Sequence, residues 1–223
     1  MTDMINMSRL SNGVRSAGLM LRAVGDALYI AKNRTAFGRS LIDLPLMRRQ
    51  LIKMIVTAEE GRSMCLHTAE ILRRADAGDQ FCSKLMRIMT PLIKFRTCRD
   101  ARKVTGDGME VRGGSGYIEE WSDARVLRDA YLGSIWEGTS NVVALDVKRA
   151  IRREQSLEAL TNYAAQLLDN SDIPTASREK LAAAHERACV LADNVVNARE
   201  NEADVRRMAS ALYNACLLYT SDA

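Results

Sequence analysis

The sequence predicts an all-α protein: an up-and-down four-helix bundle over residues 1–153, with a further helical extension over residues 154–223. Two observations support this fold. Apolar residues recur at alternating spacings of three and four through most of the chain, which is the 3.5-residue period of bundled helices. Only three prolines occur in 223 residues and aromatic residues are 5% of the chain, so we expect long helices with an aliphatic core.

The first two helices follow from their apolar seams. The first seam covers residues 7–31, and Gly38 is placed as the C-terminal cap of this helix. Asp43, with Pro45 in the following first turn, starts the second helix, whose seam covers residues 47–72. The seam residues are, in order, Met7, Leu10, Val14, Ala17, Leu21, Val24, Leu28 and Ala31, then Met47, Leu51, Met54, Ala58, Gly61, Cys65, Thr68 and Leu72.

Two more helices complete the predicted bundle. A third seam covers residues 81–95, with Pro91 as a candidate kink, and a shorter fourth helix carries Val143, Val147 and Ala150. Helices of this period cross at about 20° in a bundle. Three further seams, over residues 157–167, 181–198 and 205–215, form the extension, and residues 170–174 separate the first two. The chain begins almost inside a helix and ends without a cap over residues 219–223, so we expect a truncated fragment.

Residues 113–141 form the longest segment without helical periodicity. Long loops between helices are usually functional or disordered. The aromatic and apolar content of this segment argues against disorder. We therefore expect a functional loop here.

Composition excludes several classes of protein. The five cysteines include no CxxC pair and only two histidines occur, which argues against a metal site and against a disulfide framework. No run of about 18 apolar residues predicts a membrane-spanning helix. The chain is therefore expected to be cytoplasmic. Residues 1–150 carry 24 Lys and Arg against 17 Asp and Glu, so this part has the charge to meet an anionic ligand, although solvated helix faces explain the charges equally well.

Three motifs in residues 113–141 give a family resemblance. They are GGSGY at residues 113–117, the pair Arg128-Asp129, and the tripeptide Glu137-Gly138-Thr139. In this order and separation they resemble the C-terminal domain of the FAD-dependent acyl-CoA dehydrogenases. The resemblance implies FAD as cofactor, acyl-CoA as substrate, assembly as a dimer of dimers and an electron-transfer protein as acceptor.

The resemblance implies that Glu137 is the catalytic base. Such a base removes the proton α to a thioester carbonyl, and it works best in an apolar pocket that raises its pKa. Ile135 and Trp136 are expected to form that pocket. The alternative is a surface glutamate favoured by the start of the next helix. Some family members keep the base immediately before an arginine of the first helix, but Ser8 stands there and cannot act as a carboxylate.

The resemblance also implies FAD and substrate contacts. Arg34 belongs to the family's R-x-x-F-G motif and is implied to contact the FAD pyrophosphate of a neighbouring subunit, although a helix-end arginine is the structural alternative. The glycine pair is implied to contact flavin or simply to reverse the chain, and the residues after the base to contact flavin, to cap the fourth helix, or both. Pro45 replaces a glutamine that often contacts flavin. The implied FAD residues are Arg34, Thr35, Phe37, Gly113, Gly114, Thr139, Ser140 and Asn141, and the implied substrate-side residues are Arg9 and Gly138.

The resemblance is greatest to the adaptive, DNA-alkylation-response branch of the family. Members of that branch have been linked to DNA binding through their C-terminal region, but this extension is net acidic, so nucleic-acid binding is not expected. The first reading is thus part of an acyl-CoA dehydrogenase that is inactive alone. The alternatives are a nucleic-acid-binding flavoprotein and a non-catalytic helical interaction module. Arg128-Asp129 is expected to form a structural ion pair.

Overall fold

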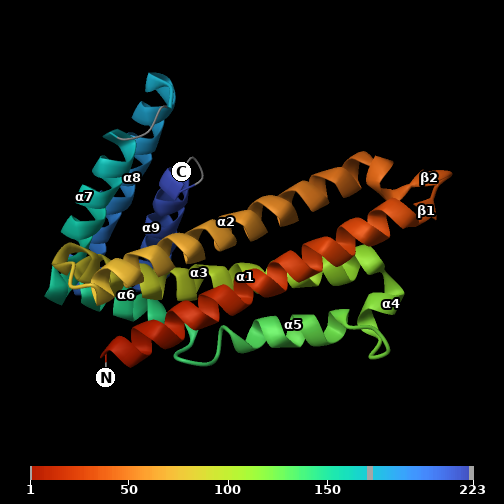
Figure 1. Cartoon of the computed structure of the whole chain (residues 1–223), viewed down its shortest axis with the longest axis horizontal. Coiled ribbons are helices and arrows are strands. Elements are labelled where there is room, and N and C mark those ends of the chain that lie inside the picture. Colours follow the sequence, from red (N-terminus) through yellow and green to blue (C-terminus); the bar gives the residue numbers. More distant parts are fainter. Residues whose placement is uncertain (1, 170–172, 221–223) are drawn as a thin grey trace.

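The computed structural model describes residues 2–169 and 173–220, and these consist of helices joined by loops and by one short hairpin. Three long helices run up and down beside one another, and a shorter fourth helix lies across one end (Figure 1). These four helices are α1 (Thr2–Asn33), α2 (Pro45–Asp76), α3 (Gln80–Arg112) and α6 (Ser140–Glu154). The predicted all-α bundle is confirmed.

Helix α3 is the centre of the molecule. It packs against α1, α2 and α6, and also against α5 (Asp123–Leu132) and two helices of the extension. Every residue from 85 to 95 is buried, so no face of this stretch meets water. Two of these buried residues are charged, Arg87 and Lys94. A buried charge is costly unless polar groups solvate it, so both side chains need specific partners.

In α1, every second residue of the predicted apolar seam lies one position after the residue that is actually buried. Val14 and Leu21 are 50% and 36% exposed, whereas Met20 and Ala27 are fully buried. A 3.5-residue pattern through Leu10 can continue in either phase, because both phases share every seventh residue. Gly13 and Ala27 are small and let α1 approach its neighbours closely. The phase that contains them is therefore the buried one, although its residues are less apolar than those of the predicted phase.

Gly38 was predicted as a helix cap, and this is wrong. Helix α1 ends at Asn33, and β1 (Thr35–Ala36) pairs with β2 (Arg39–Ser40) around a turn at Phe37-Gly38. Both turn residues have positive φ, 54° and 75°, as a type I′ hairpin turn requires. A 3₁₀ turn, η1 (Leu41–Asp43), then leads to α2. Pro45 lies in the first turn of α2 as predicted, but the predicted start at Asp43 is wrong, because Asp43 belongs to the 3₁₀ turn and Leu44 is the N-cap.

Residues 113–141 are more helical than expected. They contain α4 (Gly114–Tyr117) and the ten-residue helix α5, which runs back along the bundle under α1 and α3 (Figure 1). The buried residues of α5 include Asp123, Ala124 and Ala130. The helical period was hidden because one buried position is an aspartate, which pairs with Arg112 at 2.6 Å.

The extension confirms the three further predicted helices. It comprises α7 (Ser156–Asp169), α8 (Thr175–Asn197), the 3₁₀ segment η2 (Arg199–Asp204) and α9 (Val205–Thr220). Part of the predicted break after α7, residues 170–172, and the chain end at 221–223 lie outside the described residues. No helix in the described ranges is long and apolar enough to cross a membrane.

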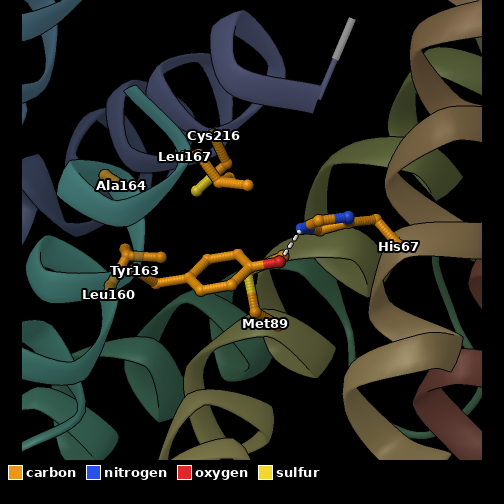
Figure 2. A pocket seen from close by; sticks show the side chains of 7 residues that line it. All are labelled: His67, Met89, Leu160, Tyr163, Ala164, Leu167 and Cys216. Atoms are coloured by element: carbon orange, nitrogen blue, oxygen red, sulfur yellow. Dashed lines mark hydrogen bonds between the residues drawn. The ribbon is translucent and has the colours of Figure 1, made fainter. Parts of the chain in front are cut away.

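The junction between extension and bundle is packed and contains a partly buried polar pair. The Tyr163 hydroxyl lies 2.6 Å from His67 Nε2, and Met89, Leu167 and Cys216 surround the pair (Figure 2). Burial lowers the pKa of His67. The cavity at this junction has a volume of about 10 Å³, which is room for about one water molecule. It therefore serves packing and holds no ligand.

Candidate active site

The predicted site residues gather at opposite ends of the bundle. Arg34 and Gly113 lie where α1 meets the end of α3, which we call the hairpin end (residues 34–44 and 112–117). Glu137 lies at the other end of α5, near the start of α1, on the segment we call the base loop (residues 133–139) (Figure 1). The glycine pair and the base loop are therefore separated by the length of α5 in this chain (Figure 1).

At the hairpin end, Arg34 lies against the glycine turn. Its Nη1 donates to the carbonyl of Arg112 at 2.6 Å, and a Cβ on Gly113 would lie 3.3 Å from the same nitrogen. Gly113 has φ +77°, a conformation that suits glycine. Two motifs that are 79 residues apart in sequence thus form one exposed surface. Thr35, Phe37 and Gly114 are exposed beside them, and Phe37 is 91% exposed.

At the other end, Glu137 is exposed on a strained part of the base loop. Its φ is +55°, and Gly138 follows with φ +101°. A non-glycine residue in this region is uncommon, and such residues cluster at functional sites. Ile135 and Trp136 are 58% and 59% exposed, so within this chain they do not form the apolar pocket expected around Glu137.

The residues after the base begin α6. Thr139 is the N-cap by position, but its side chain makes no capping hydrogen bond, so the predicted capping role is carried by the backbone alone. Ser140 is partly exposed and Asn141 fully exposed. Asn141 also lines a surface groove with Glu202 and Arg206 of the extension. The extension thus borders the proposed site.

Arg9, predicted on the substrate side, is 6% exposed and belongs to a buried ion network. It pairs with Asp146 of α6, and Arg87 of α3 donates to both oxygens of the same carboxylate at 2.9 and 3.0 Å. Arg87 also reaches Glu154 at 3.0 Å. Burial alone would raise the pKa of Asp146, but the hydrogen bonds from Arg87 and Arg9 outweigh it, so the pKa is lowered. This network fixes α1, α3 and α6 to one another.

Lys94 is a buried charged residue beside the predicted site that the sequence did not reveal. It is 2% exposed, and its Nζ donates to the carbonyls of Gly133 and Gly138 at 2.7 and 2.8 Å. Both carbonyls belong to the base loop. The one available signal was a lysine inside the apolar run from residue 85 to residue 95.

Arg128 makes a structural ion pair, as predicted, but with a different partner. Its guanidinium binds both oxygens of Glu119 at 2.6 and 3.0 Å, and both side chains are exposed. This pair ties the segment before α5 to α5 itself. It has no contact with the base loop.

Sequence comparison agrees with the motifs. Residues 1–152 match the family model of the acyl-CoA dehydrogenase C-terminal domain. The chain is 33% identical over 173 residues to acyl-CoA dehydrogenase family member 11 of Caenorhabditis elegans, which covers 76% of this chain and 28% of that protein. It is 35% identical over 159 residues to AidB of Escherichia coli, covering 71% of this chain and 29% of AidB. The chain thus spans less than a third of the length of these relatives.

Comparison with solved structures extends the match to the whole chain. The structure of C. elegans ACDH-11 in complex with C11-CoA has a TM-score of 0.88 and 27% identity, and it covers 98% of this chain and 40% of that one. Butyryl-CoA dehydrogenase of Megasphaera elsdenii has a TM-score of 0.61 and 26% identity, and covers only 68% of this chain and 38% of its own. The extension therefore has a counterpart in ACDH-11. The chain belongs to the acyl-CoA dehydrogenase family, is similar to the adaptive-response branch, and carries the family's C-terminal helical domain.

Proposed function

We propose that this chain supplies the catalytic base and part of the FAD site of an enzyme that dehydrogenates acyl-CoA thioesters between the α and β carbons. The observation that carries the proposal is the base loop of a family member. It holds Glu137 outward in a left-handed conformation, next to a glycine at φ +101°. Binding of C11-CoA by the similar ACDH-11 supports acyl-CoA as the substrate class.

Glu137 would take the α proton of the bound thioester onto a carboxylate oxygen. Because Glu137, Ile135 and Trp136 are exposed, the substrate and further protein would have to exclude water from the carboxylate. Gly138 has no side chain to obstruct an acyl group, and we keep it and Arg9 as proposed substrate-side residues. Arg9 Nε is buried with no hydrogen-bond partner in the part of the chain described, so Arg9 has donor capacity beyond its ion pair with Asp146.

The hairpin end fits the pyrophosphate of FAD. Arg34 is exposed, and only Nη1 of its guanidinium fork has a hydrogen bond within the described residues. The remaining donors suit phosphate oxygens. When bound, FAD would accept the hydride that leaves the β carbon. Since the hairpin end and the base loop lie at opposite ends of the bundle, we propose that Arg34 serves the flavin of a neighbouring subunit in a dimer of dimers. Thr139, Ser140 and Asn141 would serve the flavin of their own subunit.

Substituting Glu137→Gln in the flavin-loaded enzyme tests the base. We expect the turnover number for acyl-CoA to fall by about 10²- to 10⁴-fold, the usual contribution of a general base, with bound flavin retained. Glu120→Gln is the matched control, because Glu120 is an exposed glutamate of the same segment. Unchanged turnover in Glu137→Gln would show that Glu137 is not the base, and no turnover by the unmodified flavin-loaded protein would favour the non-catalytic helical module.

One observation favours the nucleic-acid alternative. Arg99 and Arg102 of α3 line a surface groove whose edge includes Tyr131. The groove is lined by four cationic side chains and one carboxylate, so positive charge is concentrated there; they are Arg96, Arg99, Arg102 and Lys103, with Asp100. If this groove binds DNA, a gel-shift series should show a steep salt dependence that Arg99→Ala reduces by about one unit of slope. A salt-independent or absent shift excludes this alternative.

A further inference from the structure

Lys94 is a buried ammonium that contacts backbone rather than a carboxylate. It has no ion pair within 4.0 Å among the described residues, and its two hydrogen bonds both go to carbonyls of the base loop. Burial lowers its pKa, with Arg9 and Arg15 of α1 acting in the same direction and Cys98 and Glu137 in the opposite one. A lysine kept at such a site, in the middle of the central helix, has a specific structural task.

The two acceptors lie on either side of the proposed base. Gly133 begins the base loop and Gly138 follows Glu137, so one nitrogen holds both ends of the tip formed by residues 134–137. The start of the loop is fixed in other ways as well. Ser134 Oγ donates to the carbonyl of Cys98 at 3.3 Å, and a Cβ on Gly133 would lie 3.0 Å from Ser16 Oγ.

The second half of the loop depends on Lys94 more than the first. The amides of Ser134, Ile135 and Trp136 donate to carbonyls of α5 at 3.0, 3.0 and 3.1 Å. In the described part of the chain, no backbone hydrogen bond involves the amides of Glu137 or Gly138, the two residues with positive φ. The bond from Lys94 to the Gly138 carbonyl is thus the contact that holds the strained pair, and strained backbone persists only where its surroundings impose it.

We propose that Lys94 is a positioning residue that fixes the base loop and so aims the Glu137 carboxylate out of the bundle. The chemical meaning of this role rests on the proposed function. The clamp itself does not, because it can be measured without any substrate.

Amide hydrogen exchange of the whole chain tests the clamp. In Lys94→Met, the amides of Ile135 and Trp136, which are the hydrogen-bonded amides next to the strained pair, should exchange at least about tenfold faster than in the unmodified chain, and the amide of Ser134 should change less. Lys148→Met is the matched control, because the Lys148 side chain is also largely shielded, at 12% exposure, and its one ion pair among the described residues is a 4.0 Å contact with Glu202. Equal exchange in both variants and in the unmodified chain would overturn the proposal.

A second variant separates hydrogen bonding from packing. Lys94→Gln keeps N–H donors on a neutral side chain, and it carries the test if circular dichroism shows that Lys94→Met is unfolded. We expect Lys94→Gln to exchange within about threefold of the unmodified chain. Exchange at least tenfold faster in a folded Lys94→Gln protein would contradict positioning through these bonds.

The flavin-loaded enzyme links the clamp to catalysis. Lys94→Met should lower kcat at least about tenfold and change KM for acyl-CoA less than about threefold, and Lys94→Gln should restore part of kcat. Faster exchange of the base loop with unchanged turnover in both Lys94→Met and Glu137→Gln would sink the proposed function while leaving the clamp intact. An unchanged kcat in Lys94→Met, where Glu137→Gln is inactive, would sink the catalytic meaning of the clamp.

Discussion

The hairpin end and the base loop both present exposed residues on strained backbone, but they are supported differently. Phe37 and Glu137 have nearly the same φ, 54° and 55°. At the hairpin end, Arg34 donates one exposed hydrogen bond to the last residue of α3. The base loop stands on buried Lys94, beside the buried network around Asp146. A group that must meet one reacting atom needs a rigid mount, whereas a guanidinium that meets phosphate oxygens tolerates adjustment.

The largest effect is expected where charge is most deeply buried. Asp146→Ala leaves two buried guanidinium groups without their shared partner, and breaking such a network costs about 3–5 kcal/mol. Urea unfolding would measure the loss. The control is Asp26→Ala, which breaks the more exposed Arg22–Asp26 pair and should cost no more than about 1 kcal/mol. Similar losses in the two variants would remove the distinction between the buried and exposed pairs.

The second-largest effect is expected from a lower pH, which should reduce the stability of the end of the bundle that carries the base loop. The pKa of Asp146 is lower in the folded chain than in the unfolded one, so its contribution is complete above the unfolded-state value near 4 and is lost as pH falls through the folded value. The free energy of unfolding should therefore decrease between about pH 5 and pH 3. Asp146→Asn should flatten this decrease. An identical pH slope in Asp146→Asn would show that other carboxylates dominate.

At the hairpin end the expected effect is on ligand rather than on fold. Arg34→Ala should weaken FAD binding by the assembled enzyme about 10- to 100-fold, the value of a charge-assisted contact. Thermal stability of the chain should change by less than about 1 kcal/mol, because the Arg34 side chain is exposed. Flavin titration of Arg39→Ala, an exposed arginine on β2, gives the control. Equal flavin loss in both variants would point to general charge rather than to a site.

The smallest effect concerns the hairpin turn itself. Phe37→Asn should stabilise the chain by about 0.5–1 kcal/mol, because asparagine suits the left-handed conformation of a type I′ turn better than phenylalanine. Phe37→Ala, which keeps the strain, should give no such gain in a thermal melt. If flavin binding weakens in both variants, the ring of Phe37 is retained for its ligand contact at the expense of the turn.

Sequence reasoning found the exposed chemistry and missed what supports it. Arg34, Gly113 and Glu137 belong to short motifs, so their positions could be predicted, and the roles given to them remain proposals. Lys94 and Asp146 belong to no motif, and their hydrogen-bond partners are 39 to 137 residues away in the chain. Within a helical sequence pattern, a lysine or aspartate predicts a solvent-exposed position, and only the tertiary structure shows that it is buried. The wrong phase predicted at Val14 and Leu21 has the same origin, because the period of apolar residues does not show which helix will pack against which face.

The enclosure of α3 also bears on where this protein can be divided. Tyr213 of α9 is fully buried with its hydroxyl 3.2 Å from Thr97 of α3, and Leu160 and Met89 belong to the same apolar cluster. Proteolytic removal of the extension after α6 would expose an apolar strip along the middle of α3 to water. The end of the family match is therefore not a point at which the chain divides into independently stable parts. Shortened versions for expression should retain α7 to α9.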